Sequence, residues 1–453
     1  MPEEQHDPRQ IKASPTKEFF IHMLVRDIPL HRAIIDLIDN SVDGARRIRP
    51  DGRFDSLWVR LEVKPSHFRI ADNCGGIPVD NARNYAFRFG RPKEATAIAG
   101  SIGQFGVGMK RTFFKLGRQF DVASATAVSR FSVEIKLEDW VARYNREGEE
   151  DWHFEFKTLE EGVVVPEEQQ GTTIEIKVLH ASVAQSFAQD EFISRLSQEI
   201  AVAHEMSMDR GLSISLNGIP LRHDPLRLLN SALIQPARID LEYTDLGPKP
   251  VKVSLFAGLS DRSKEEGGWY VFCNGRMVLR ADQSNLTVWA EGERVPKYRP
   301  DFARFRGLAY LDSDDASLLP WTTTKTGVDA DSPVYRAVRQ QMIEITRPVL
   351  DFLRRVEDER KMHEDGDIQE NPLASAIAAA SGEAISDLPA RSVFVAPQPP
   401  PPPPGPRMRR IQYSKRADEV ERAKALLQVD SFKEVGEKTF EYFMTYEGGS
   451  DAQ

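Results

Sequence analysis

Hydrophobic and polar positions follow both helical and strand-like spacing between residues 16 and 180. Residues 16–48 carry apolar side chains at helical spacing, interrupted by Pro29, and predict helix. A further helix is expected from Met109 to Leu116. The alternating segments that predict strands are 57–63, 67–70, 120–125, 131–137 and 172–179. The pattern predicts a region in which several strands share one sheet and helices accompany them.

A second region with the same mixture follows. Residues 193–204 predict a helix, and residues 332–361 predict a long one. The strand-like segments between them are 212–216, 251–257 and 269–273. Taken with the first region, these elements predict an α+β protein with domains at 1–185 and 186–361.

Composition changes after residue 361. Residues 362–410 are acidic, then Ala-rich, and finally Pro-rich, with six consecutive prolines at 399–404. Such a run cannot donate backbone hydrogen bonds and favours an extended, stiff spacer, so we expect a disordered linker over 362–410. A small helical segment is predicted over 411–449, where Ser431 and Glu434 have the spacing of a capping box.

The overall composition is that of an ordinary globular protein. The 453 residues are 40% hydrophobic and 28% charged, and the net charge of −9 argues against general nucleic-acid binding while leaving room for a local basic groove. The two cysteines, Cys74 and Cys273, are too few for a disulfide framework or a cysteine-based zinc site. So few cysteines favour a reducing, cytoplasmic setting. No run of 18 apolar residues occurs, so we expect no membrane span.

The segment from Gly100 to Lys110 contains four glycines and ends in a lysine. Glycines let the backbone approach a charged ligand closely, and consecutive amides followed by a helix start form an anion site. A glycine-rich loop by itself is often only a turn. We therefore look for other polar groups that would belong to the same site.

Two acidic segments precede this loop. On a helix, Asp36, Asn40 and Asp43 share one face, where a carboxylate and an amide oxygen one turn apart would hold Mg²⁺ and a water; a solvated acidic face is the alternative. Asp72 ends a strand before paired glycines and exposes a carboxylate suited to the adenine amine, or forms a simple Asx-turn. Thr172 opens a later strand, where its hydroxyl would support Asp72.

In order and spacing these segments resemble the ATP-binding motifs of the GHKL superfamily, which includes gyrase, heat-shock-ninety chaperones, histidine kinases and MutL. Residues 37–43 look like its helix box and residues 102–108 like its glycine box. The resemblance covers about residues 16–180. It implies a Bergerat-type α/β sandwich, in which helices cover one face of a mixed sheet and ATP lies between helices under a lid, here residues 91–101.

The resemblance also implies roles for individual residues. Asn40 would coordinate Mg²⁺, Asp72 would bind adenine with help from Thr172, and Lys110 would contact the phosphates. The other residues implied to contact the nucleotide are Asp43, Gly76, Ile77, Gly103, Gln104, Phe105, Gly106, Val107, Gly108 and Met109. The chain departs from the family at two places. Asp36 stands where hydrolysing members have a longer glutamate that orients the attacking water, and Cys74 interrupts the usual Asp-x-Gly-x-Gly turn.

Residues 270–278 look like the strand and turn of the transducer domain in MutL and Microrchidia proteins. Residues 318–325 resemble the loop that delivers a lysine to the ATP γ-phosphate in those proteins, which makes Lys325 a second catalytic candidate; an exposed loop lysine is the alternative. This resemblance covers about residues 190–350. It favours the MutL, Microrchidia and heat-shock-ninety-like ATPases over histidine kinases.

Two functions remain open at this stage. One is a Mg²⁺-dependent ATPase that acts as a nucleotide-gated homodimer or clamp, in which hydrolysis is slow because Asp36 is short. The other is an ATP-responsive switch or chaperone-like module with little hydrolysis, which recruits protein partners through the Pro-rich linker and the C-terminal helices. DNA is a partner by resemblance only.

Overall fold

The computed structural model describes residues 13–26, 28–90, 100–103, 106, 108–146, 148–322, 324–365, 368–389, 393–398, 411 and 413–447. They divide into two compact units, one within 1–357 and 373–399 and the other within 358–372 and 400–453. The first unit contains helices and two large sheets, which confirms the predicted α+β class. No helix among the described residues is long and apolar enough to cross a membrane.

The first sheet has eight strands in the order β5-β4-β3-β6-β2-β1-β7-β8. Neighbouring strands are antiparallel except β1 and β7, which are parallel. Side chains along β1 alternate, with Val59, Leu61 and Val63 buried, so one face of the sheet belongs to the core. The strands are β1 (Trp58–Lys64), β2 (His67–Asp72), β3 (Gln119–Ala125), β4 (Ser129–Lys136), β5 (Phe156–Glu161), β6 (Gly171–Ile176), β7 (Ser213–Leu216) and β8 (Ile219–Pro220).

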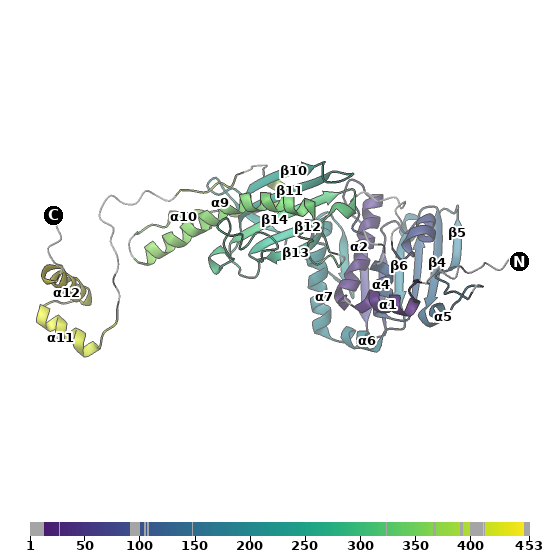
Figure 1. The fold of residues 1–453 in the computed structure, drawn as a ribbon, viewed down its shortest axis with the longest axis horizontal. Coiled ribbons are helices and arrows are strands. Elements are labelled where there is room, and N and C mark those ends of the chain that lie inside the picture. Colours follow the sequence, from purple (N-terminus) through teal and green to yellow (C-terminus); the bar gives the residue numbers. More distant parts are fainter. Residues whose placement is uncertain are drawn as a thin grey trace. The chain divides into compact units, whose positions relative to one another are not determined.

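Helices accompany this sheet (Figure 1). The central one, α2 (Leu30–Ile48), buries an apolar stripe in the core and begins directly after Pro29. Gly44 lets α2 approach the turn after β2, since a Cβ there would lie 2.6 Å from the Cys74 carbonyl oxygen. The remaining helices are α1 (Lys17–Arg26), α3 (Val79–Asn81), a π-helical turn (Ala82–Ala86), α4 (Gly108–Leu116), α5 (Leu137–Val141), α6 (Ala181–Phe187), α7 (Asp190–Ala203) and α8 (Glu205–Asp209).

The boundary predicted at residue 185 differs from the structure. β7 lies well beyond that boundary, yet Ser213 and Leu216 pair in parallel register with Trp58 and Leu61 of β1. A parallel pair needs a crossover connection, and a chain segment that includes α6 and α7 supplies it before β7. The sequence pattern marks the strand but contains no information on which sheet it joins.

The second sheet has the order β10-β11-β14-β12-β13, in which only β12 and β14 are parallel. Its strands are β10 (Ala237–Tyr243), β11 (Val251–Leu259), β12 (Gly268–Cys273), β13 (Arg276–Asp282) and β14 (Phe305–Ser313). The long helix α9 (Pro333–Glu364) runs beside this sheet (Figure 1). Val338, Met342, Ile345 and Val349 of α9 are buried at helical spacing, which explains why the predicted helix forms there.

The prediction of a disordered linker over 362–410 is wrong for its central part. Residues 372–398 contain α10 (Pro372–Ala378) and β15 (Ser381–Ala384), and β15 pairs antiparallel with β9 (Arg227–Asn230). Leu373 and Phe394 are buried in the core of the first unit. Composition averaged over this stretch hides the few apolar residues that attach it to the fold. The six prolines lie outside the described residues.

The second unit contains the two C-terminal helices, α11 (Ala417–Leu427) and α12 (Phe432–Tyr446). Both agree with the helices predicted between residues 411 and 449. Ser431 and Glu434 form the predicted capping box, in which the Ser431 side chain accepts from the Glu434 amide and Glu434 accepts in return.

Candidate functional site

A cavity of about 230 Å³ lies beside α2, the turn after β2 and the start of α4. Every described residue that the sequence predicted for the site lines it, including Lys325, although the sequence alone could not place these segments together. The predicted residues in its lining are Asp36, Asn40, Asp43, Asp72, Gly76, Ile77, Gly103, Gly106, Gly108, Met109, Lys110, Thr172 and Lys325. Gln104, Phe105 and Val107 lie outside the described residues, as do residues 91–99 of the predicted lid over 91–101.

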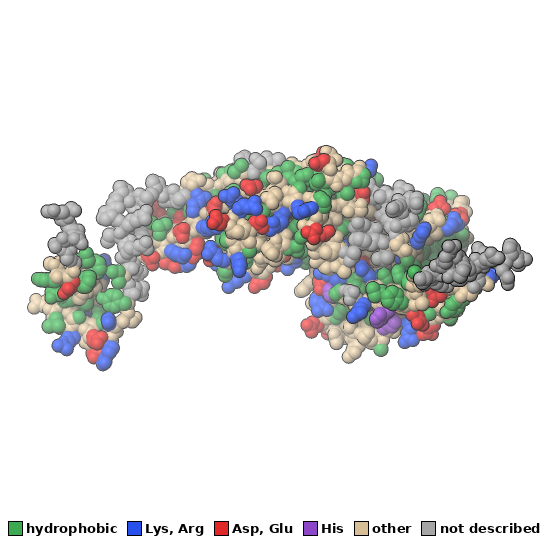
Figure 2. Space-filling view, in the orientation of Figure 1, with side chains coloured by type: hydrophobic (Ala, Val, Ile, Leu, Met, Phe, Trp, Pro, Cys, Tyr) green, Lys and Arg blue, Asp and Glu red, His purple; other side chains and the backbone are tan. Residues whose placement is uncertain are grey.

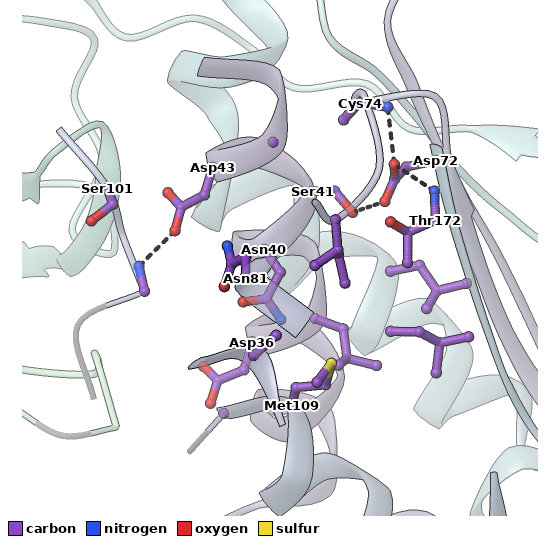
Figure 3. A pocket seen from close by; sticks show the side chains of 18 of the residues that line it. Asp36, Asn40, Ser41, Asp43, Asp72, Cys74, Asn81, Ser101, Met109 and Thr172 are labelled. Atoms are coloured by element: carbon purple, nitrogen blue, oxygen red, sulfur yellow. Dashed lines mark hydrogen bonds between the residues drawn. The ribbon is translucent and has the colours of Figure 1, made fainter. Parts of the chain in front are cut away.

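Asp72 stands at the end of β2 with its carboxylate fixed by three donors (Figure 3). One oxygen accepts from the Ser41 hydroxyl at 2.7 Å, and the other accepts from the amides of Cys74 at 2.9 Å and Thr172 at 3.3 Å. Burial raises the pKa of Asp72, and these hydrogen bonds oppose the rise. The result is an oriented acceptor at the cavity wall.

Thr172 supports Asp72 in a different way from the sequence prediction. Its backbone amide, and not its hydroxyl, donates to Asp72, because β2 and β6 pair Asp72 directly with Thr172. The hydroxyl lies 3.1 Å from the Ser124 hydroxyl instead. Ser41 is the hydroxyl that reaches Asp72, and its place one residue after Asn40 in the helix motif was the only sequence signal for it.

The turn after Asp72 requires glycine. Gly75 and Gly76 have φ of +81° and +66°, and a Cβ on Gly76 would lie 2.0 Å from the Ala125 carbonyl oxygen. Arg47 of α2 donates to the carbonyl oxygens of both glycines. Cys74, which stands where the family pattern has a glycine, is buried beside this turn.

Asp43 holds the glycine-rich segment. Its two carboxylate oxygens accept from the amides of Ile102 at 2.7 Å and Gly103 at 2.8 Å. Burial raises the pKa of Asp43, opposed by these bonds and by nearby Arg46. Because these two amides are already engaged, phosphate donors must come from further along the segment. The start of α4 at Gly108 offers the amides of a first helical turn, which have no partner within the helix.

Lys110 is a buried cation beside the cavity. Its ammonium donates to the carbonyl oxygens of Ala86 at 2.8 Å and Gly106 at 2.5 Å, and no described carboxylate forms an ion pair with it. Burial lowers the pKa of Lys110 to about 7. An anion in the cavity would therefore favour the charged form of Lys110 and would be stabilised by that charge.

Asp36 is paired with an arginine that sequence reasoning missed. The Arg111 guanidinium donates to one oxygen of Asp36 at 2.5 Å, and the two side chains are only 10% and 4% exposed. Arg111 follows Lys110 on α4, so a basic residue just after the glycine segment was its only signal. The carboxylate expected to orient water is thus partly occupied.

Asp39, which the sequence did not single out, is the centre of a buried charge cluster. Its carboxylate lies 2.7 Å from Lys325 Nζ, 3.1 Å from Arg276 Nε and 3.6 Å from His204 Nε2. Burial alone would raise the pKa of Asp39, but the positive charges of Lys325 and Arg276 lower it to about 2. Burial and the neighbouring Arg276 lower the pKa of His204 to about 3, so the imidazole is neutral at pH 7.

Lys325 is buried, with φ of +52° and its Nζ donating to Asp39. Burial would lower the pKa of Lys325, but Asp39 and Asp36 together raise it above its usual value. The alternative of an exposed loop lysine is therefore wrong. An ammonium has three protons, so Lys325 can serve Asp39 and a ligand in the cavity at once.

The residues around the cavity fit a Mg²⁺ ion for which the protein supplies only some of the oxygen ligands and a bound ligand supplies others. No group of three or more His, Cys, Asp or Glu among the described residues could hold a metal alone. The exposed amide of Asn40 lies at the cavity, which Asn81 also lines (Figure 3), and no hydrogen bond joins this amide to another described residue. One or two protein oxygens completed by phosphates and water are the usual coordination of Mg²⁺.

Part of the chain matches a known family model. Residues 28–161 match the family model described as "Histidine kinase-, DNA gyrase B-, and HSP90-like ATPase". The match spans the chain from the start of α2 to β5 and includes Asp36, Asp72 and Lys110. It confirms the GHKL superfamily for the N-terminal domain, a domain type that binds ATP. No curated protein matches the chain.

Proposed function

We propose that the chain binds Mg²⁺–ATP in this cavity, hydrolyses it slowly, and uses the nucleotide to control how the two sheets of the first unit are held together. The observation that carries the proposal is the position of Lys325. This residue comes from the loop after the second sheet, yet it lines the cavity formed by α2 and the glycine segment. A ligand there touches both halves of the unit at once.

Each end of the nucleotide has matching groups. Asp72 accepts the hydrogen bond of the adenine amine, and Asn40 supplies an oxygen to Mg²⁺, which neutralises phosphate charge when bound. The first turn of α4 and Lys110 bind the phosphates, and Lys325 stabilises charge on the terminal one. This assignment puts Lys110 and Lys325 at the phosphate end of the cavity.

Hydrolysis requires a base or an orienting group for water. Asp36 is the candidate, and its second oxygen, free of Arg111, orients the water. The bond from Arg111 and the short side chain both restrict Asp36, which is why we propose slow turnover. The same bond favours a second function, an ATP-responsive switch that binds nucleotide tightly and releases little phosphate.

The experiment measures ATP affinity and phosphate release for the wild type and for Asn40→Ala, Asp36→Ala and Lys325→Ala. Asn84→Ala is the matched control, because Asn84 is exposed and does not line the cavity. Asn40→Ala should weaken Mg²⁺-dependent binding, and Asp36→Ala should abolish turnover while retaining affinity. Full activity in Asn40→Ala would refute the site assignment. Strong binding with negligible phosphate release in the wild type would favour the switch.

We further propose that ATP promotes a homodimer of the MutL or Microrchidia type, on the strength of the sequence resemblance. Light scattering with a non-hydrolysable ATP analogue tests it, and a mass unchanged by the analogue counts against it. DNA binding has weaker support, since positive and negative side chains are interspersed on the face shown in Figure 2. Binding that is insensitive to both salt and nucleotide would exclude a nucleotide-gated DNA clamp.

A further inference from the structure

The turn between β12 and β13 reaches the glycine-rich segment of the other sheet's domain. Asn274 in this turn is 1% exposed and has a left-handed φ of +45°. Its side-chain oxygen accepts from the Ser313 amide at 2.9 Å. Its side-chain nitrogen donates to the Ser313 carbonyl at 3.0 Å and to the Ser101 carbonyl at 2.9 Å. Both side-chain amide protons of Asn274 are thus hydrogen-bonded, and the one that bonds Ser101 connects the second sheet to the domain of the first.

A second turn of the same kind shows which of these bonds belong to the turn itself. Asn217 precedes Gly218 between β7 and β8, has φ of +50°, and bonds the Val63 amide at 2.8 Å and the Val63 carbonyl at 3.1 Å. Its backbone amide donates to Leu61, as that of Asn274 donates to Leu311. Both turns end a parallel strand pair. Asn274 therefore makes the same kinds of bond as Asn217 and, in addition, the hydrogen bond to Ser101.

Ser101 belongs to residues 100–103, the first limb of the glycine segment, and contacts from two sides hold the backbone of this limb in place. The next two amides, of Ile102 and Gly103, donate to Asp43 of α2. Arg46 of α2 donates both to the Gly100 carbonyl and to the Asn274 carbonyl, so helix and turn hold the limb jointly. The limb lines the cavity through Ser101 and Gly103. A change in the position of the turn therefore acts directly on the cavity wall.

The same turn also contacts the other side of the site. Arg276, two residues after Asn274, forms the buried ion pair with Asp39 of α2 at 3.1 Å. The turn thus has one hydrogen bond to the glycine segment, and it has both this ion pair and the hydrogen bond from Arg46 to the helix that carries Asp36 and Asn40. A single turn of the second sheet therefore connects to two of the segments that line the cavity, α2 and the glycine segment.

We propose that Asn274 is a positioning residue for the nucleotide site: by donating to Ser101 it fixes the first limb of the glycine segment and makes nucleotide affinity depend on the second sheet. The inference rests on the proposed function. It assigns Asn274 no contact with the ligand.

The test compares Asn274→Gly with Asn217→Gly. Glycine accepts the left-handed φ of both turns, and each variant loses the same pair of bonds to its partner strand. Similar losses of melting temperature are expected. Only Asn274→Gly should bind ATP more weakly, by about three- to tenfold, the usual effect of one lost hydrogen bond. It should also speed amide exchange at Ile102 and Gly103 in the nucleotide-free protein.

The outcomes separate this inference from the proposed function. If the wild type binds no ATP, the proposed function fails, while the exchange rates of Ile102 and Gly103 still test the role of Asn274. If the wild type binds ATP and both glycine variants bind equally well, the inference is wrong. Should Asn274→Gly fail to fold, Asn274→Asp gives a second test, because it keeps the acceptor for the Ser313 amide and loses the donated bonds to the Ser313 and Ser101 carbonyl oxygens. Asn217→Asp is its matched control.

Discussion

Lys110 should take up a proton when nucleotide binds. Burial without a described ion-pair partner lowers its pKa to about 7, so at pH 8 roughly nine in ten molecules have a neutral amine. A phosphate placed against it favours the charged form. We expect an uptake of about 0.9 proton per ATP at pH 8 and about 0.5 at pH 7, with affinity falling about fivefold between these values.

Calorimetry in two buffers that differ in protonation enthalpy measures this uptake. Above pH 7.5 the nucleotide contributes little, since phosphate groups titrate near pH 6. Lys110→Met should abolish the uptake. Lys115→Met is the matched control, because Lys115 lies on the same helix and donates to the Val25 carbonyl, away from the cavity. An uptake below about 0.2 proton at pH 8, or one that persists in Lys110→Met, would refute the reasoning.

The same shift predicts a pH dependence of stability. Between pH 7 and the usual lysine value near 10.4, the unfolded chain keeps the Lys110 proton and the folded chain has released it. The unfolded state therefore binds more protons, and the free energy of unfolding rises with pH in this window. Lys110→Met should lack this rise in urea unfolding at pH 7 and pH 9. An equal rise in both proteins would show that other groups cause it.

Three further predictions concern the fold around the site. Asp39→Asn leaves the Lys325 ammonium buried without its carboxylate and should lower the free energy of unfolding, measured in urea, by about 3 kcal/mol. In the wild type, the stability that Asp39 contributes is present above its unfolded-state pKa near 3.9 and is lost as the pH falls towards 2. A loss below about 1 kcal/mol would mean that the cluster is not buried. Gly76→Ala brings a Cβ against the Ala125 carbonyl in a left-handed turn and should lower the melting temperature, so an unchanged value would contradict the turn geometry. Phe394→Ala should reduce stability by about 3 kcal/mol because Phe394 packs on Phe352, whereas an unfolded linker would give no change.

Local patterns predicted much of the site. The helical spacing of Asp36, Asn40 and Asp43 and the strand that ends at Asp72 both survive in the structure, and all four residues line one cavity. These features depend on residues close in sequence, where spacing fixes direction. The function of each group was harder to predict. Asp43 binds the amides of the glycine segment, and Thr172 uses its amide where a hydroxyl was expected.

Partners distant in sequence were not predictable. The bond between Arg111 and Asp36 and the cluster around Asp39 join elements whose approach depends on how helices and sheets pack. The prediction of a disordered linker failed for a related reason. Apolar residues such as Leu373 and Phe394 are rare in this polar and Ala-rich stretch, and their burial depends on surfaces formed elsewhere in the chain.

The sequence by itself determined the α+β class and, through its resemblance to the GHKL superfamily, the superfamily of the N-terminal domain and many of the residues that line the cavity. These features could be recognised because most of the motifs lie in short segments whose internal spacing is visible in the sequence. The tertiary structure alone decided what those residues contact. It joined β7 to the first sheet, placed Lys325 on Asp39, and brought Asn274 to Ser101. Such contacts arise where surfaces from distant segments meet, and hydrogen-bond geometry there depends on the packing of the whole unit.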